Sequence, residues 1–180
     1  MKRFIPKFIS ILYANRPQQH LFLLLPLLML FAACQPSLPE AKPLDEPPVL
    51  FPDYMGVTVP CNIAPLNFRL EGAHPTIARL MAGQEELRIA ASDGSLSIPQ
   101  SSWEHLLQAA KGDQLQVELY AEREEGWVRY APFAIHVAKE PIDPYLVYRK
   151  IAPGYRMWNR MGIYQRNLTN FEEEAFLDNK

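Results

Sequence analysis

Residues 114–119 of the chain read QLQVEL, a strict alternation of polar and apolar side chains. Successive side chains of a β-strand point to opposite faces of a sheet, so a period of two is typical of a strand with one buried face. The same alternation recurs over residues 66–70 and 86–89. We therefore predict a mainly β domain of antiparallel strands over residues 54–140.

Two glycines mark tight turns between these stretches. Gly94 follows an aspartate and Gly126 follows a glutamate. Because glycine readily adopts the positive φ that a short hairpin requires, each position predicts a turn. We expect a hairpin that joins residues 87–91 to 96–98, and a second one that follows residues 117–121.

One helix is predicted between the strands. Ser101 is placed to cap its N-terminus with Glu104 as the capping-box partner, and Gly112 to close it. About seven short strands and one helix in roughly ninety residues favour an immunoglobulin-like β-sandwich, with a small α+β domain as the alternative. The expected apolar stripe of the helix consists of Trp103, Leu106, Leu107 and Ala110.

Residues 1–33 have the pattern of a signal peptide. Four basic residues precede an uncharged run of thirteen residues, 21–33. This run is shorter than the roughly 20 residues that a membrane-spanning helix needs. It ends in LFAAC at residues 30–34, which resembles the lipobox of bacterial lipoproteins and implies a diacylglycerol and palmitate on Cys34. Gln35 then implies the outer membrane, facing the periplasm; the alternative is an ordinary secreted protein.

Residues 34–53 contain six prolines. Proline fixes φ and removes a backbone donor, so we expect an extended Pro-rich tether that joins neither a helix nor a sheet. Such a tether would hold the folded domain away from the bilayer.

Residues 141–180 form an extension rich in aromatic residues and arginines. We interpret it as leading to a missing downstream domain, and as packing on that domain or on the sandwich. Its aromatic side chains Tyr148, Tyr155 and Trp158 are the candidate binding residues. We expect residues 172–174 to be a solvated acidic face and the residues that follow them to be helical.

The remaining chemistry-bearing residues suggest no active site. With 18 basic and 20 acidic residues the net charge is −2, which argues against a nucleic-acid-binding protein. The four histidines lack metal-ligand spacing, and no nucleophile motif is present. Cys61, flanked by Val57, Val59 and Ile63, is expected to be buried. We predict no catalytic residue, no metal site and no cofactor within this chain.

Four motifs carry a resemblance to a known family: VPCNIAPLNF (59–68), EPIDPYLVYR (140–149), PGY (153–155) and QRNLTNFE (165–172). They resemble the N-terminal region of TolB-like β-propeller envelope lipoproteins, often labelled cytochrome c biosynthesis or haem-binding proteins. The resemblance implies a continuation into a Cys-x-x-Cys-His segment and a propeller, neither of which occurs in these residues.

These observations predict a non-enzymatic, lipid-anchored adaptor. Its partners would be the membrane, through the N-terminal lipid, and a TolB-like propeller or another envelope protein or glycan. The alternative is the leading fragment of a haem-binding redox protein whose haem motif lies downstream of residue 180.

Overall fold

The computed structural model describes residues 35–72, 75–151 and 162–178. The predicted signal peptide and the predicted site residues Cys34, Tyr155 and Trp158 lie outside these ranges.

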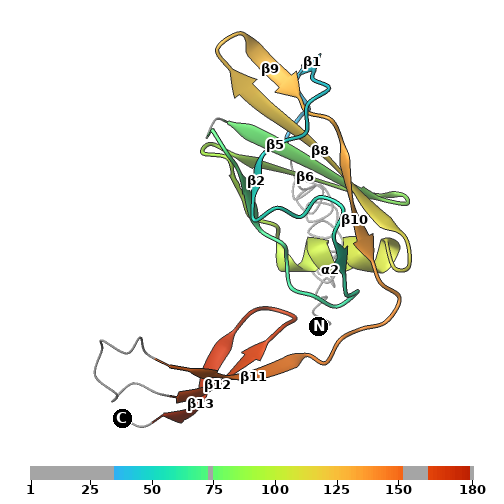
Figure 1. The fold of residues 1–180 in the computed structure, drawn as a ribbon. Coiled ribbons are helices and arrows are strands. Elements are labelled where there is room, and N and C mark those ends of the chain that lie inside the picture. Colours follow the sequence, from blue (N-terminus) through green and yellow to red (C-terminus); the bar gives the residue numbers. More distant parts are fainter. Residues whose placement is uncertain (1–34, 73–74, 152–161, 179–180) are drawn as a thin grey trace, which may run out of the picture. The chain divides into compact units, whose positions relative to one another are not determined.

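The main sheet is built around the long strand β8 (Gln114–Arg123). On one side β8 pairs with β5 (Thr76–Ala82), which pairs with β6 (Glu85–Ala91). On the other side β8 pairs with β9 (Gly126–Arg129) and β10 (Phe133–Val137), all antiparallel. Two short strands complete the sheet at its edges (Figure 1). Strand β1 (Lys42–Pro43) runs parallel to β9, and strand β3 (Thr58–Val59) runs parallel to β10.

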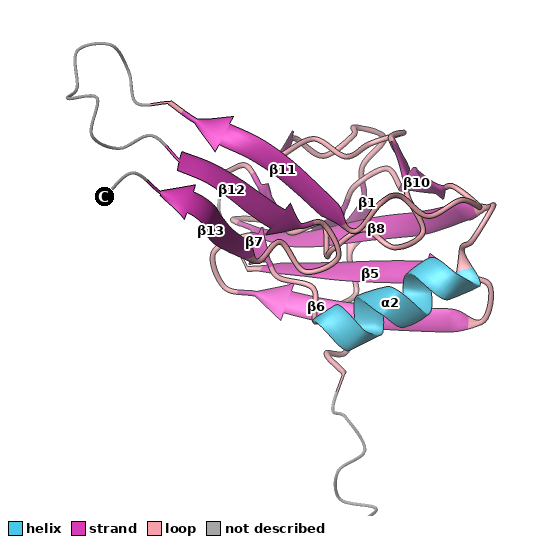
Figure 2. Ribbon diagram, turned by 90° about the horizontal axis from the view of Figure 1, so that it is seen from below, coloured by secondary structure: helices cyan, strands magenta, loops and turns pink. Residues whose placement is uncertain are grey.

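A second sheet and one helix supply the opposing layer. The second sheet contains β2 (Leu50–Phe51), β4 (Phe68–Leu70) and β7 (Ser95–Leu96). Helix α2 (Gln100–Ala109) contacts β5 and β6 (Figure 2). Leu70 and Leu96 from the second sheet share one buried cluster with Leu80 and Val117 from the main sheet.

The apolar positions of the alternating pattern in residues 114–119 are the side chains of β8 that are buried in this core. Leu115, Val117 and Leu119 of β8 are at most 1% exposed, whereas Gln114 at the start of the strand is exposed. The prediction of a β-sandwich with one short helix is confirmed: the structure is mainly β, with several sheets and a single helix in its described part.

The predicted helix is confirmed, but its predicted cap is wrong. The whole apolar stripe is buried, including Trp103 at 0% exposure. The N-cap position is Pro99 in extended conformation without a side-chain cap, so Ser101 lies inside the helix. Gln100 donates instead to the Glu104 carboxylate at 2.7 Å. Within the described residues, no helix is long and apolar enough to cross a membrane.

The two predicted turns have different outcomes. Gly126 has φ +110° and lies in the β8–β9 hairpin, as predicted. Gly94 has φ +78°, but the hairpin predicted there is wrong, because β7 pairs with β4 rather than with β6. The Asp93 carboxylate accepts a hydrogen bond from the Ser95 N–H at 3.0 Å, in a turn that takes the chain from one sheet to the other.

The prediction that the tether joins no sheet is wrong, because its residues from Lys42 onward contribute two strands to the sandwich. β1 and β2 both fall within residues 34–53, and Leu50 is only 6% exposed. The Leu44 N–H donates to the Arg129 carbonyl at 2.7 Å. Pro43 has no N–H to donate, but β1 is an edge strand and pairs with a neighbour on one side only. A proline is tolerated there because its missing N–H can face away from the neighbouring strand.

A ladder of charges crosses three neighbouring strands of the main sheet. Arg79 on β5 pairs with Glu86 on β6 at 2.6 Å and with Glu118 on β8 at 3.3 Å, and Arg88 also pairs with Glu86. The hydrogen bond from Arg79 is the main cause that lowers the pKa of Glu86, and the one from Arg88 adds to it. At pH values above the ordinary carboxylate pKa, the ionised Glu86 side chain therefore stabilises the folded state. This stabilisation is lost as the pH falls through the lowered pKa of Glu86.

Candidate functional site: the C-terminal sheet

A third sheet follows the sandwich in the sequence. It is an antiparallel meander of β11 (Tyr145–Lys150), β12 (Gly162–Asn167) and β13 (Glu173–Asp178), with an irregularity between Ile163 and Tyr164. The helix expected at the end of the chain is therefore wrong. Glu, Ala and Leu are good helix formers, but the intrinsic preference amounts to less than about 1 kcal/mol per residue, and the pairing of β13 with β12 overrides it.

Glu173 is the centre of a cluster on one face of this sheet. Strand alternation and register place Tyr148, Lys150, Tyr164 and Arg166 on the same face as Glu173. The Glu173 carboxylate accepts hydrogen bonds from the Tyr148 hydroxyl, the Lys150 ammonium and, at 3.0 Å, the Arg166 guanidinium. The expectation that residue 173 belongs to a solvated face is thus wrong, since its carboxylate links all three strands.

Aromatic contacts support the same cluster. The rings of Tyr148 and Tyr164 are stacked with their centroids 6.3 Å apart. The Lys150 ammonium lies 4.3 Å from the centroid of the Tyr164 ring. A cation over a ring face is attracted by the ring quadrupole, so Lys150 stabilises the sheet through the ring as well as through the carboxylate. Tyr148, a predicted binding residue, therefore has a structural role here.

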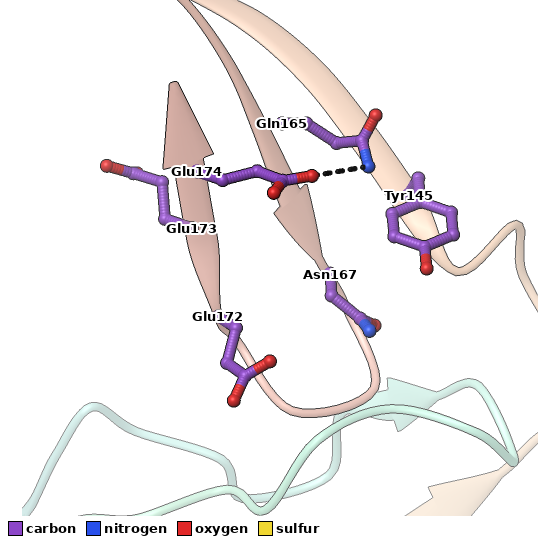
Figure 3. Close-up of a pocket in the computed structure, with 6 residues that line it drawn as sticks. All are labelled: Tyr145, Gln165, Asn167, Glu172, Glu173 and Glu174. Carbon is purple, nitrogen blue, oxygen red and sulfur yellow. Dashed lines mark hydrogen bonds between the residues drawn. The ribbon is translucent and has the colours of Figure 1, made fainter. Parts of the chain in front are cut away.

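A shallow pocket of about 470 Å³ lies on this sheet (Figure 3). Gln165 donates to the Glu174 carboxylate at 3.3 Å, and Figure 3 shows these two side chains directed toward each other. The carboxylates of Glu172 and Glu174 face the pocket, whereas the Glu173 carboxylate is bonded on the opposite face of the sheet, and no cation lines the pocket. The pocket therefore presents mainly hydrogen-bond acceptors to a ligand. The lining residues are Tyr145, Gln165, Asn167, Glu172, Glu173 and Glu174.

The two outer strands of the sheet expose large apolar side chains. On β11, Tyr145, Leu146 and Val147 are 49–58% exposed, and on β13, Phe176 is 73% and Leu177 63% exposed. In the described part of the chain, β11 and β13 each pair only with β12, so no described strand pairs with the outer edge of either. We call these five side chains and the two edges that carry them the apolar edges. Unpaired edges with exposed apolar residues are typical of sites that associate with another chain.

Backbone and amide contacts attach this sheet to the sandwich. The Asn62 side chain donates to the Ile142 carbonyl at 2.9 Å and accepts from the Ile142 N–H at 3.0 Å. The Ala64 N–H donates to the Leu168 carbonyl in the β12–β13 turn at 2.8 Å. The amide of Gln100, the first residue of α2, donates to the carbonyl of residue 169 in the same turn at 2.9 Å. Sequence reasoning missed Asn62, because nothing local in the chain indicates a partner eighty positions away.

The remaining candidates lie elsewhere. Cys61 is 4% exposed, and its Sγ lies 3.5 Å from the Lys139 carbonyl oxygen, so its predicted burial is confirmed. His105 and His136 are exposed. Among the described residues, no group of three or more His, Cys, Asp and Glu side chains is arranged to hold a metal ion.

No family model, curated protein or solved structure matches this chain.

Proposed function

We propose that the protein is a non-enzymatic adaptor of the bacterial envelope, anchored by lipid at Cys34 and docking a β-rich partner through its C-terminal sheet. The observation that carries the proposal is the pair of apolar edges on β11 and β13. The partner class that fits best is a β-propeller of the TolB-like kind. Such a domain is built of antiparallel sheets and can cover exposed apolar strands.

The apolar edges suit a sheet-forming partner for two reasons. An added strand could pair with the outer edge of β11 or β13, and its side chains would cover Val147 or Phe176. The contacts of Asn62 and Ala64 with the C-terminal sheet would fix it to the sandwich before a partner arrives. A surface that is already ordered loses less conformational entropy on binding than a flexible one.

The anchor is supported by the sequence around Cys34. An uncharged run leads to LFAAC at residues 30–34, the first described strand begins at Lys42, and Gln35 favours the outer membrane. Membrane attachment by several acyl chains would be stable, whereas one chain holds only marginally. We place the protein on the periplasmic side of the outer membrane.

Replacing Cys34 with alanine is expected to abolish membrane attachment without affecting folding. In cells fed radioactive palmitate, the wild-type protein should incorporate label and partition into the detergent phase of Triton X-114. The C34A variant should do neither. Cys61→Ala is the matched control, because it removes the buried thiol and should leave labelling intact. Labelling and detergent partitioning of C34A equal to wild type would refute the anchor.

Replacing Phe176 with lysine is expected to weaken docking at least about ten-fold, because a charge would have to be desolvated in an apolar contact. The measurement is the affinity of the purified full-length protein for a purified TolB-like propeller domain. Val49→Lys is the matched control, since Val49 is 62% exposed, directly precedes β2 of the sandwich and is not one of the five side chains of the apolar edges. Equal affinities of both variants and the wild type would refute docking through β13, as would the absence of any binding.

A further inference from the structure

A separate pocket of about 640 Å³ lies in the sandwich, where β1, the β8–β9 hairpin and the turn after β4 meet. Its apolar lining comes from both sheets, with Leu70, Ala121, Val128 and Tyr130 each at most 8% exposed. Trp127 is half-buried in the same lining. The volume falls in the range of roughly 300–1,000 Å³ that small-molecule sites occupy. This pocket shares no residue with the one on the C-terminal sheet.

The rim of the pocket offers donors and acceptors in nearly equal numbers. It contains two cationic and three anionic side chains, all exposed. Apart from Arg123, none of them has a side-chain hydrogen bond or ion pair within the described part of the chain, so their polar groups are free for a ligand. The rim consists of Lys42, Glu71, Arg123, Glu124 and Glu125.

Arg123 is held in place over the pocket. One of its terminal nitrogens donates to the Tyr130 hydroxyl at 2.5 Å, and its guanidinium carbon lies 5.4 Å from the centroid of the Tyr130 ring. Tyr130 itself is only 6% exposed, so the ring that positions the guanidinium is rigid. The other N–H groups of Arg123 therefore have a defined direction before any ligand binds, which reduces the entropy lost on binding.

We propose that this pocket binds a neutral oligosaccharide. A sugar ring has apolar C–H faces, which suit the lining of Trp127, Leu44 and Val128, and hydroxyl edges that both donate and accept hydrogen bonds. An anionic or cationic ligand would meet a charge of its own sign on the rim, because Arg123 and Lys42 stand beside Glu71, Glu124 and Glu125. The inference does not depend on the partner proposed for the C-terminal sheet.

The test is a titration of the full-length protein, purified in a detergent without a sugar headgroup. The probes are chitotriose, cellotriose and maltotriose. Binding of each is measured by calorimetry and by the change in tryptophan fluorescence. We expect at least one to bind with a dissociation constant of about 1 mM or tighter. Because the ligand is neutral, raising the salt from about 50 to 500 mM should change this constant less than about two-fold.

Two variants locate the site. Trp127→Ala should weaken binding about ten-fold or more. Glu125→Gln keeps the size of an exposed side chain and so leaves the fold intact, and it should weaken binding about three-fold or more. Tyr145→Ala, in the pocket of the C-terminal sheet, is the control and should bind like wild type. The proposal is overturned if none of the three sugars binds at concentrations up to 10 mM, or if both W127A and E125Q bind sugar as tightly as the wild type. It is also overturned if the protein binds only charged oligosaccharides or peptides.

Discussion

Replacing Trp103 with alanine is expected to lower the free energy of unfolding by about 3–5 kcal/mol, the usual cost of truncating a large buried aromatic side chain. Trp103 is 0% exposed in α2, and its indole N–H donates to the Ile63 carbonyl at 2.9 Å. The variant would lose the buried area, leave a cavity and leave that carbonyl without its donor. The measurement is urea denaturation followed by far-ultraviolet circular dichroism.

One further substitution separates packing from hydrogen bonding at Trp103, and another serves as a surface control. Trp103→Phe retains an aromatic ring without the donor, so it should cost less than Trp103→Ala. His105→Ala removes an exposed side chain from the same helix and should change stability by less than about 0.5 kcal/mol. A W103A protein as stable as H105A would contradict the assignment of Trp103 to the centre of the core.

Replacing Asn62 with alanine is expected to destabilise the attachment of the C-terminal sheet by about 2 kcal/mol, since two hydrogen bonds of about 1 kcal/mol each are lost. Both bonds join the Asn62 amide to the backbone of Ile142, at the entrance to β11. The readout is amide hydrogen exchange. Protection in β11 and β12 should fall by about thirty-fold, which corresponds to 2 kcal/mol, while β5 and β8 should retain theirs.

Asn67 provides the matched control. Its side-chain oxygen accepts a hydrogen bond from the Ile98 N–H at 2.9 Å, a contact entirely within the sandwich. Asn67→Ala should therefore reduce protection in the sandwich and have no selective effect on β11. If N62A and N67A produced the same exchange pattern, Asn62 would not be the specific link between the two parts.

Local patterns in the sequence were sufficient to predict the sandwich. The alternation around Val117 and the stripe that includes Trp103 each depend on which face of one element is buried, and both positions are 0% exposed. The turn at Gly126 also follows from local backbone conformation. Gly94 shows the limit of this reasoning, because a turn predicts a change of direction but not the strand with which the next segment pairs.

Long-range pairing explains what the sequence did not reveal. The prolines of residues 34–53 indicate a segment without regular structure, yet an edge position allows Pro43 to lie in a strand. Glu173 lies in an acidic run that is typical of a solvated surface. Its role appears only when register brings Tyr148 and Arg166 next to it from two other strands. The pocket beside Arg123 likewise requires segments that are far apart in the chain.

Strands β1 and β10 run in the same direction in the main sheet, with β9 and β8 between them, and this arrangement has a mechanical consequence. A pull between Lys42 and Val137 would draw β1 and β10 in opposite directions along their length. The hydrogen bonds between them would then be loaded in shear and would share the force, whereas a hairpin pulled at its ends opens one bond at a time. Resistance to such a pull depends on the rate of unfolding rather than on equilibrium stability. A pull between Lys42 and Val137 should therefore meet more resistance than a pull that opens the β8–β9 hairpin from its open end.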